Sequence, residues 1–219
     1  MIIFDWIKHG GLLLTQGGPV MYIILLVSIG GVAISLERIW HFTRGRTDHR
    51  RMLADVKDLL VDDFVYKAMA RCDEDRGPVA HILKAVLKNK DREPDTIRDA
   101  IDAAALEEIS RLERRVSGLG TIANVSTLLG LLGTIIGMIV TFSSVADQMT
   151  GLVNVNLLAD GISQAMLTTA FGLSVAIPTT VVHAYLVSEI KKFTVAMEHS
   201  AAELIHFLEH QPQKEADAI

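Results

Sequence analysis

Hydrophobic residues in this chain gather into three long runs that contain no Asp, Glu, Lys or Arg. The first lies within residues 9–36 and is most apolar over 20–36, the second covers Val116–Ala146, and the third covers Gly161–Ser188. About 20 apolar residues with a rise of 1.5 Å each cross a hydrocarbon core roughly 30 Å thick. The pattern therefore predicts an all-α integral membrane protein with three transmembrane helices.

The first run is predicted to be a retained helix over residues 19–41. Pro19 suits the first helical turn, where its missing N–H leaves no hydrogen bond unmade, and Glu37 and Arg38 follow the run. A cleaved signal peptide is the alternative. The run starts late, Lys8 is the one basic residue before it, and no clear small-residue cleavage site follows, so the retained helix is favoured.

Basic residues predict the orientation of the spans. Of the 21 Lys and Arg residues, 17 lie from Arg38 to Arg115, whereas the connection between the second and third runs has none. Cytoplasmic segments beside membrane spans are enriched in Lys and Arg. The N-terminus and the short connection are therefore expected outside the cytoplasm, with the large loop and the C-terminal tail inside.

Helical spacing also marks the parts outside the membrane. Apolar residues recur at three- and four-residue steps in two groups, which are Leu53, Val56, Leu59, Leu60 and Phe64, and then Val79, Ile82, Leu83, Val86 and Leu87. The spacing predicts two buried helical stripes with a break at Gly77–Pro78. A further helix is expected to begin near Pro94–Asp95 and run into the second span. The second and third spans exceed the length that the hydrocarbon needs, so both are expected to extend into a cytosolic helical bundle.

These expectations divide the chain into segments. An outer N-terminal segment at 1–18, either an interfacial helix or a frayed terminus, precedes the first span at 19–41. A cytosolic helical loop at 42–115 leads to the second span at 116–144, and a short periplasmic connection at 145–160 leads to the third span at 161–188. A cytosolic helix at 189–210 and a disordered tail at 211–219 follow.

Composition excludes several classes of protein. The net charge of −5 argues against nucleic acid as a partner, since nucleic acid calls for a basic patch. Cys72 is the one cysteine, so no disulfide framework is available, and it is expected to be a small thiol packed among cytosolic helices. His206 and His210 lack a third metal ligand. No nucleophile–base pair, phosphate-binding loop or zinc spacing occurs, so neither an enzyme nor a cofactor is expected.

The second span carries hydroxyls and glycines in register. Thr127, Thr134 and Thr141 are seven residues apart and stay within about 40° of one another on a helix. Three glycines form a smooth strip beside them, which permits close helix packing, namely Gly130, Gly133 and Gly137. The threonines either bond to carbonyl groups one turn back or line a narrow polar path.

The third span repeats this character. One face carries small and hydroxyl residues at helical spacing: Ala165, Thr169, Gly172, Ala176, Thr180 and His183. Gln164 and Thr168 share a different face and are also candidates for lining the polar path. Pro178 removes one backbone hydrogen bond and can kink the helix. His183 is the one candidate for a proton relay in these spans, and a structural role near the membrane interface is favoured for it. Any protons that cross would need an acid from another chain.

Two blocks resemble the motifs of a known family. The block from Leu128 to Met138, LLGLLGTIIGM, is similar to the second-span motif of the MotA/TolQ/ExbB proton-channel family. The block from Ala165 to Pro178, AMLTTAFGLSVAIP, is similar to its third-span motif. The number of spans and the chain length are more similar to the TolQ and ExbB branch than to the MotA branch.

The resemblance implies a function. In the family, a homopentamer of this subunit surrounds a pair of single-span TolR- or ExbD-like partners in the bacterial inner membrane, and an aspartate of the partner carries the proton. Thr134 and Thr169 match the threonines that line its route. The work would reach a TonB- or TolA-like protein, and TonB-type uptake, Tol-type envelope maintenance and gliding-type motility stay open.

One residue departs from the family pattern. TolQ- and ExbB-like members usually carry a glutamate where this chain has Gln164, and an amide keeps the hydrogen bonding but cannot titrate. A structural role for this position is favoured over altered conduction. A non-conducting membrane scaffold is the first alternative function. A solute transporter is the second, although the spans show neither a charged group at the midplane nor repeated halves.

Overall fold

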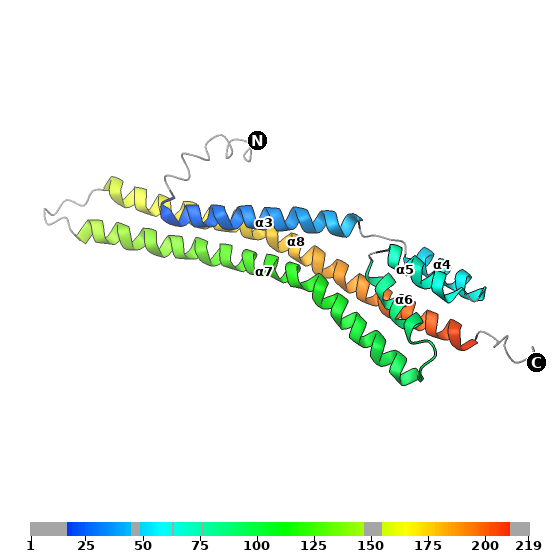
Figure 1. Ribbon diagram of the computed structural model, residues 1–219. Coiled ribbons are helices and arrows are strands. Elements are labelled where there is room, and N and C mark those ends of the chain that lie inside the picture. Colours follow the sequence, from blue (N-terminus) through cyan, green and yellow to red (C-terminus); the bar gives the residue numbers. More distant parts are fainter. Residues whose placement is uncertain (1–16, 45–48, 63, 76, 147–154, 211–219) are drawn as a thin grey trace, which may run out of the picture. The chain divides into compact units, whose positions relative to one another are not determined.

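The computed structural model describes residues 17–44, 49–62, 64–75, 77–146 and 155–210, and its regular elements there are helices. In chain order they are α3 (Pro19–Arg44), α4 (His49–Val61), α5 (Val65–Glu74), α6 (Pro78–Lys88), α7 (Pro94–Ala146) and α8 (Val155–His210) (Figure 1). Three of them, α3, α7 and α8, are long and apolar enough to cross a membrane. The predicted helical fold with three long apolar helices is confirmed. The predicted outer segment and disordered tail lie outside the described residues, apart from Gly17 and Gly18.

Helix bounds follow backbone hydrogen bonding more than the edges of the charge-free runs. α3 begins at Pro19, and α7 begins at Pro94, 22 residues before the charge-free run at Val116. α8 begins at Val155, six residues before the predicted start of the third span, and continues to His210. A helix can carry charged residues in turns that face water, so a charge marks the edge of the apolar part and not the end of the helix.

The chain forms two compact units, and the first contains Met1–Glu37 and Val116–Ala184. In it, parts of α3, α7 and α8 pack together. A methyl group on Gly31 of α3 would lie 3.1 Å from the Ile122 side chain of α7 and 3.6 Å from the Thr179 hydroxyl of α8. Fully buried side chains such as Met21 and Leu119 fill the interior. One helix of the unit therefore contacts both of the others.

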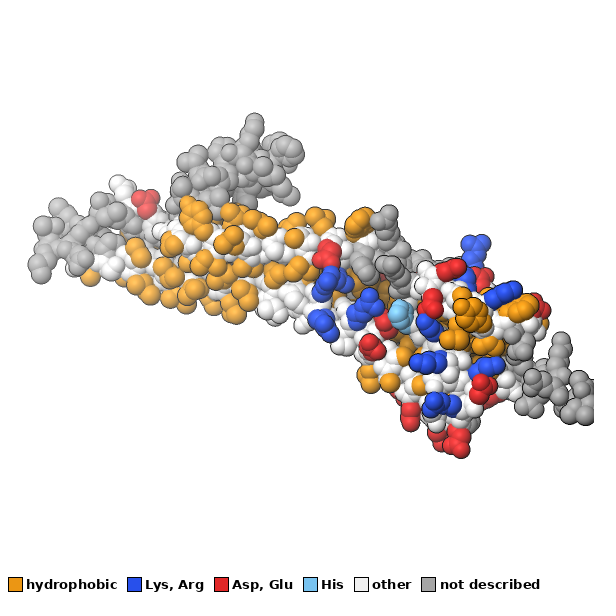
Figure 2. Space-filling model, viewed as in Figure 1, with side chains coloured by type: hydrophobic (Ala, Val, Ile, Leu, Met, Phe, Trp, Pro, Cys, Tyr) orange, Lys and Arg blue, Asp and Glu red, His pale blue; other side chains and the backbone are white. Residues whose placement is uncertain are grey.

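Large apolar side chains cover the outside of the first unit. Leu26 is 71% exposed, Met166 68% and Val181 64%, and Figure 2 shows hydrophobic side chains along this part of the molecule. Exposing such apolar groups to water is unfavourable, whereas the hydrocarbon of a bilayer accommodates them. The outer surface of the first unit is that of a protein surrounded by lipid or by other apolar helices.

The second unit contains Arg38–Arg115 and Tyr185–Ile219. Its core joins α4, α5 and α6 to the parts of α7 and α8 that belong to this unit. Val56, Ile82 and Leu204 are fully buried there. Charged side chains cover its surface in Figure 2, and Lys57 of α4 pairs with Glu203 of α8 at 2.6 Å. The second unit thus combines an apolar core with a charged surface.

The region around Phe64 differs from the sequence prediction. The predicted stripe from Leu53 to Phe64 ends early, because α4 ends at Val61 and Phe64 lies just before α5, with its backbone N–H bonded to the carbonyl of Leu59. Phe64 is 45% exposed, so its assignment to a buried stripe is wrong. The centre of its ring instead lies 3.9 Å from the Nζ atom of Lys67. Helix α5, which follows, was not predicted.

Candidate functional site

In the first unit, α7 and α8 meet along a line of small residues. Gly130 of α7 lies against Thr169 and Gly172 of α8, and a methyl group on Gly130 would be 3.3 Å from the Thr169 Cα atom. A methyl group on Gly172 would be 2.7 Å from the carbonyl oxygen of Ser126, closer than Cβ atoms approach a backbone. Glycine at both positions therefore lets the two backbones come close together.

Two more glycines of α7 continue this contact toward the end of the helix. A methyl group on Gly133 would lie 2.6 Å from the Cβ atom of Thr168, and one on Gly137 would lie 2.9 Å from the Cβ atom of Ala165. All four glycines that the sequence analysis selected thus lie between α7 and α8. Pro178 lies within α8 and is exposed.

One hydroxyl connects the two helices by a hydrogen bond. The Thr169 hydroxyl of α8 donates to the carbonyl oxygen of Gly130 in α7 over 3.0 Å. Thr169 is half-buried. Because Gly130 has no side chain, its carbonyl is accessible to a group on the neighbouring helix. This bond links one turn of α8 to one turn of α7.

The other predicted threonines bond within their own helices. Thr134 donates to the Leu131 carbonyl over 2.6 Å, and Thr127 donates to the Ala123 carbonyl over 3.2 Å. Such bonds to a carbonyl one turn back are the usual way in which a threonine is satisfied inside a membrane helix. Two further bonds of this kind join Thr141 to Gly137 and Thr168 to Ala165, at 2.7 Å and 2.8 Å.

The three threonines of α7 differ in their surroundings. Thr127 is exposed, Thr134 is half-buried, and Thr141 is buried with Gly161 directly against its hydroxyl. A heptad step drifts by about 20° on a straight helix, so the three threonines do not keep the same neighbours along α7. The structure therefore brings Thr141, Thr168 and Thr169 into the α7–α8 contact, but it leaves Thr127 outside it.

Thr134 borders an open apolar surface on α7. A shallow groove there is lined by Thr134 together with four apolar side chains, which are Ile135, Met138, Ile139 and Phe142. Each of these four is exposed, and Ile139 is 61% exposed. The Thr134 oxygen thus lies at the edge of a surface that is apolar and uncovered within one chain.

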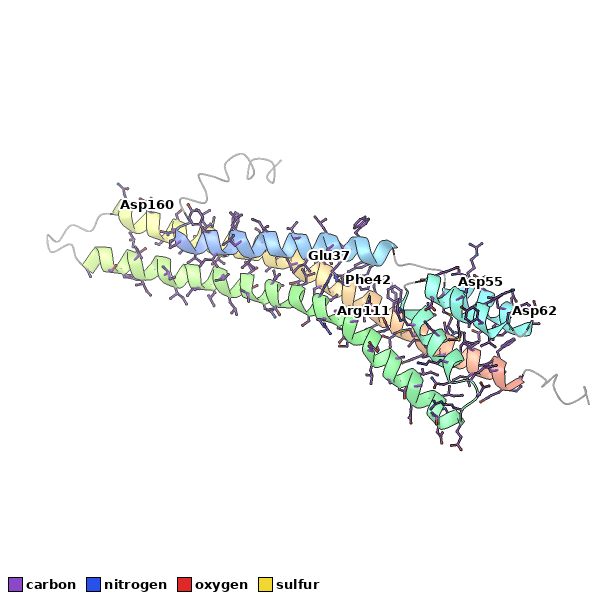
Figure 3. All side chains as sticks on the ribbon, in the orientation of Figure 1. Glu37, Phe42, Asp55, Asp62, Arg111 and Asp160 are labelled. Atoms are coloured by element: carbon purple, nitrogen blue, oxygen red, sulfur yellow. The ribbon has the colours of Figure 1, made fainter. Side chains whose placement is uncertain are left out.

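Charged groups lie only at the ends of the described part of the first unit. Within residues 17–37, 116–146 and 155–184, the Asp, Glu, Lys and Arg residues are Glu37 and Asp160, both labelled in Figure 3. His183 is half-buried, and its ring lies against Gly120, where a methyl group would be 2.9 Å from Nε2. No group of three His, Cys, Asp or Glu side chains in the described chain can hold a metal ion.

Two contacts in this region were missed by the sequence analysis. Gln164 is half-buried, and its amide lies against Gly18 at the start of α3. Thr141 lies against Gly161 at the start of the third predicted span. The signal in the sequence was a glycine in each case, but a lone glycine does not say which residue it faces.

The sequence of the region matches a known family. Residues 74–199 match the family described as the MotA/TolQ/ExbB proton channel family, which is more than half of the 219-residue chain. The chain belongs to the MotA/TolQ/ExbB family. The match includes both spans that carry the glycine contact and the Thr169 bond, and the family that the sequence resembled is confirmed.

Several curated relatives are members of the same family. The ExbB-like protein 1 of Synechocystis is 37% identical over 175 residues, which cover 79% of this chain and 68% of that protein. An ExbB homologue of Methanothermobacter thermautotrophicus is 29% identical, over 80% of this chain and 62% of that protein. The Tol-Pal system protein TolQ of Haemophilus influenzae is 38% identical over 38% of this chain and 36% of that protein.

A solved structure has the same fold as this MotA/TolQ/ExbB member. The likeness to the structure of Campylobacter jejuni MotAB has a TM-score of 0.53 at 16% sequence identity, and it covers 97% of this chain and 94% of that chain. At this identity the likeness concerns the fold alone.

Proposed function

We propose that this protein is the channel and stator subunit of an inner-membrane motor complex driven by the proton-motive force. The observation that carries the proposal is that the described spans present hydroxyl groups but hold Asp, Glu, Lys and Arg only at their ends. Proton relays in membranes normally use titratable groups. The acid that carries the proton therefore comes from a second protein, a single-span TolR- or ExbD-like partner with an aspartate in its helix.

The contacts of α7 and α8 support the role of the fixed half of such a path. The Thr169–Gly130 bond and the glycine contacts hold the two helices at one register. A rigid wall keeps hydroxyl oxygens at fixed positions while a carboxyl group moves past them. Thr134, at the edge of the uncovered apolar groove, is available to a helix that packs there.

The assembly follows from the same reasoning. The exposed apolar faces of the first unit suit neighbouring copies and lipid, in a homopentamer around a pair of partner helices. The Lys and Arg distribution supports a periplasmic N-terminus, a cytoplasmic C-terminus and a cytosolic second unit. Proton flow would turn one component within the other and deliver mechanical work to the cell envelope. No enzymatic step is part of this proposal.

Proton uptake into liposomes tests this function. The chain is co-reconstituted with the single-span, aspartate-bearing protein encoded beside its gene, and uptake is followed with a pH-sensitive dye under an imposed membrane potential. Combining Thr134→Ala with Thr169→Ala is expected to lower uptake about tenfold, because tenfold in rate corresponds to about 1.4 kcal/mol and one lost hydrogen bond is worth about that much. Ser174→Ala is the control, since Ser174 is exposed and its hydroxyl donates to the Ala170 carbonyl of its own helix.

The same experiment tests the scaffold alternative. A structural scaffold predicts a complex that assembles with its partner and passes no protons, and it predicts that the two threonine substitutions change assembly without changing any energised phenotype. Proton uptake by the wild-type complex that falls with the threonine substitutions, while copurification of the partner is retained, excludes the scaffold.

A further inference from the structure

Gln164 is a half-buried polar side chain of α8 that takes no part in the α7–α8 glycine contact. At about 100° per residue, Gln164 and Thr169 point about 140° apart around the helix. The Gln164 amide nitrogen lies instead against Gly18, and a methyl group on Gly18 would collide with it. The side chain is therefore directed to the start of α3.

Gly18 is restricted by its backbone as well as by its neighbour. Its φ angle is +71°, in the left-handed region that residues with a Cβ atom seldom adopt. Its carbonyl accepts a hydrogen bond from the backbone N–H of Met21 over 3.2 Å. Met21 is fully buried, and its sulfur lies where a methyl group on Gly17 would need to be. The first turn of α3 is thus packed tightly at the point that Gln164 contacts.

We propose that Gln164 is a positioning residue, which holds the start of α3 against α8 through Gly18, and that its amide takes no part in proton transfer. The part about proton transfer rests on the proposed function. Glutamate has the same length and shape as glutamine, and a carboxylate would be stabilised beside the N-terminal N–H groups of a helix. Either residue can therefore fill this position, and glutamine does so without a charge.

A double-mutant cycle tests the contact in the purified full-length protein. Gly18→Ala is expected to lower the apparent melting temperature by about 5 °C, because alanine is strained at a positive φ angle and its methyl group collides with the Gln164 amide. In the Gln164→Ala background the same change is expected to cost clearly less, because the colliding amide is gone. Gly30→Ala is the control, since Gly30 lies in α3, the helix that begins directly after Gly18, and a methyl group there meets nothing within 4 Å. Equal losses from Gly18→Ala in the two backgrounds would overturn the contact.

Side-chain length and charge are then separated at position 164. Gln164→Glu is expected to keep the melting temperature of the wild type. Gln164→Asn, whose side chain is one methylene shorter, is expected to lower the melting temperature as much as Gln164→Ala does. A Gln164→Asn variant as stable as the wild type would overturn the positioning role, even if Gly18→Ala fails to fold.

Proton uptake tests the statement that the Gln164 amide takes no part in proton transfer. In the reconstituted complex, Gln164→Glu is expected to leave the rate within about twofold and the pH profile unchanged. A large gain in uptake, or a shifted profile, would overturn the statement that position 164 takes no part in proton transfer. If the wild-type complex passes no protons, the proposed function fails, and the melting temperatures still decide the positioning role.

Discussion

The hydroxyl of Thr169 in α8 donates a hydrogen bond to the carbonyl oxygen of Gly130 in α7, with the two oxygens 3.0 Å apart. Ser126, Thr127, Thr134, Thr141 and Thr168 instead donate within their own helices. The bond from Thr169 is therefore a specific contact between the second and third spans, and a change at either end acts on their register.

Replacing Thr169 with valine keeps the shape of the side chain and removes this bond. The expected loss is about 1 kcal/mol in the free energy of unfolding, or about 3 °C in the melting temperature of the purified protein. Thr169→Ser is expected to retain most of the stability because it keeps the hydroxyl. A Thr169→Val protein that melts with the wild type would contradict a stabilising role for the bond.

Replacing Gly172 with alanine places a methyl group 2.7 Å from the Ser126 carbonyl oxygen, so the two backbones must separate. Overpacking of this kind costs about 1–3 kcal/mol. The measurement is the thermal stability of the solubilised protein. Gly118→Ala is the matched control, because a methyl group at Gly118 of α7 meets nothing within 4 Å and alanine favours a helix. Stability should fall for the first variant and be kept or rise for the second.

The Cys72 thiol is predicted to react slowly in the folded protein. Burial raises its pKa from 9.0 to about 11, and the thiolate is the reactive form. Alkylation at pH 8 should therefore be more than about tenfold slower than that of a free thiol and should accelerate in denaturant. Rapid alkylation of the native protein would show that the core around α5 opens readily.

The same thiol makes stability depend on pH at the alkaline end. The folded state holds the proton up to about pH 11, whereas the unfolded state releases it near the ordinary pKa of 9.0. Between these values the folded state binds more protons, so stability falls as pH rises. Cys72→Ala should reduce this fall relative to the wild type in unfolding experiments from pH 8 to 11. If the free energy of unfolding falls with pH equally steeply in the two proteins, this contribution of the Cys72 thiol is contradicted.

The pair of Lys57 and Glu203 gives a weaker dependence at the acid end. A hydrogen bond from Lys57 holds the pKa of Glu203 below its ordinary value of 4.5. Stability from this pair is present above pH 4.5 and is lost as the pH falls through the lowered pKa. Both groups are partly exposed, so Lys57→Met is expected to cost less than about 1 kcal/mol at pH 7. Titration of Glu203 by NMR should show its pKa rising in the variant.

Spacing and composition predicted the long helices and the glycine strip, because each is a property of one segment. The break at Gly77–Pro78 and the buried face of α6 were likewise local. Helix α5 was missed because its buried face consists of two small residues, Ala68 and Cys72, which leave little apolar periodicity. Phe64 was placed in a buried stripe because its spacing continued that of α4, although the chain turns after Val61.

The pairing of residues between helices was beyond the sequence. Which glycine of α7 faces which residue of α8 depends on the register of two helices, and a shift of one turn would give an equally regular pattern of small residues. The bond from Thr169 to Gly130 and the contact of Gln164 with Gly18 are set by such registers. Both became visible only when three segments far apart in the chain were packed together.

A hydroxyl group has a single hydrogen atom, and this limits what the threonines of α7 and α8 can offer to a third group. Thr134, Thr168 and Thr169 each give that hydrogen to a backbone carbonyl, so their oxygens are left with lone pairs alone. Of the three, Thr134 lines the open groove, so a side chain that packed there would meet an acceptor and no donated hydrogen. In the proposed complex, a neutral carboxylic acid would bring the hydrogen that this oxygen can accept, whereas a carboxylate would place lone pairs against lone pairs, so the groove would favour the protonated acid.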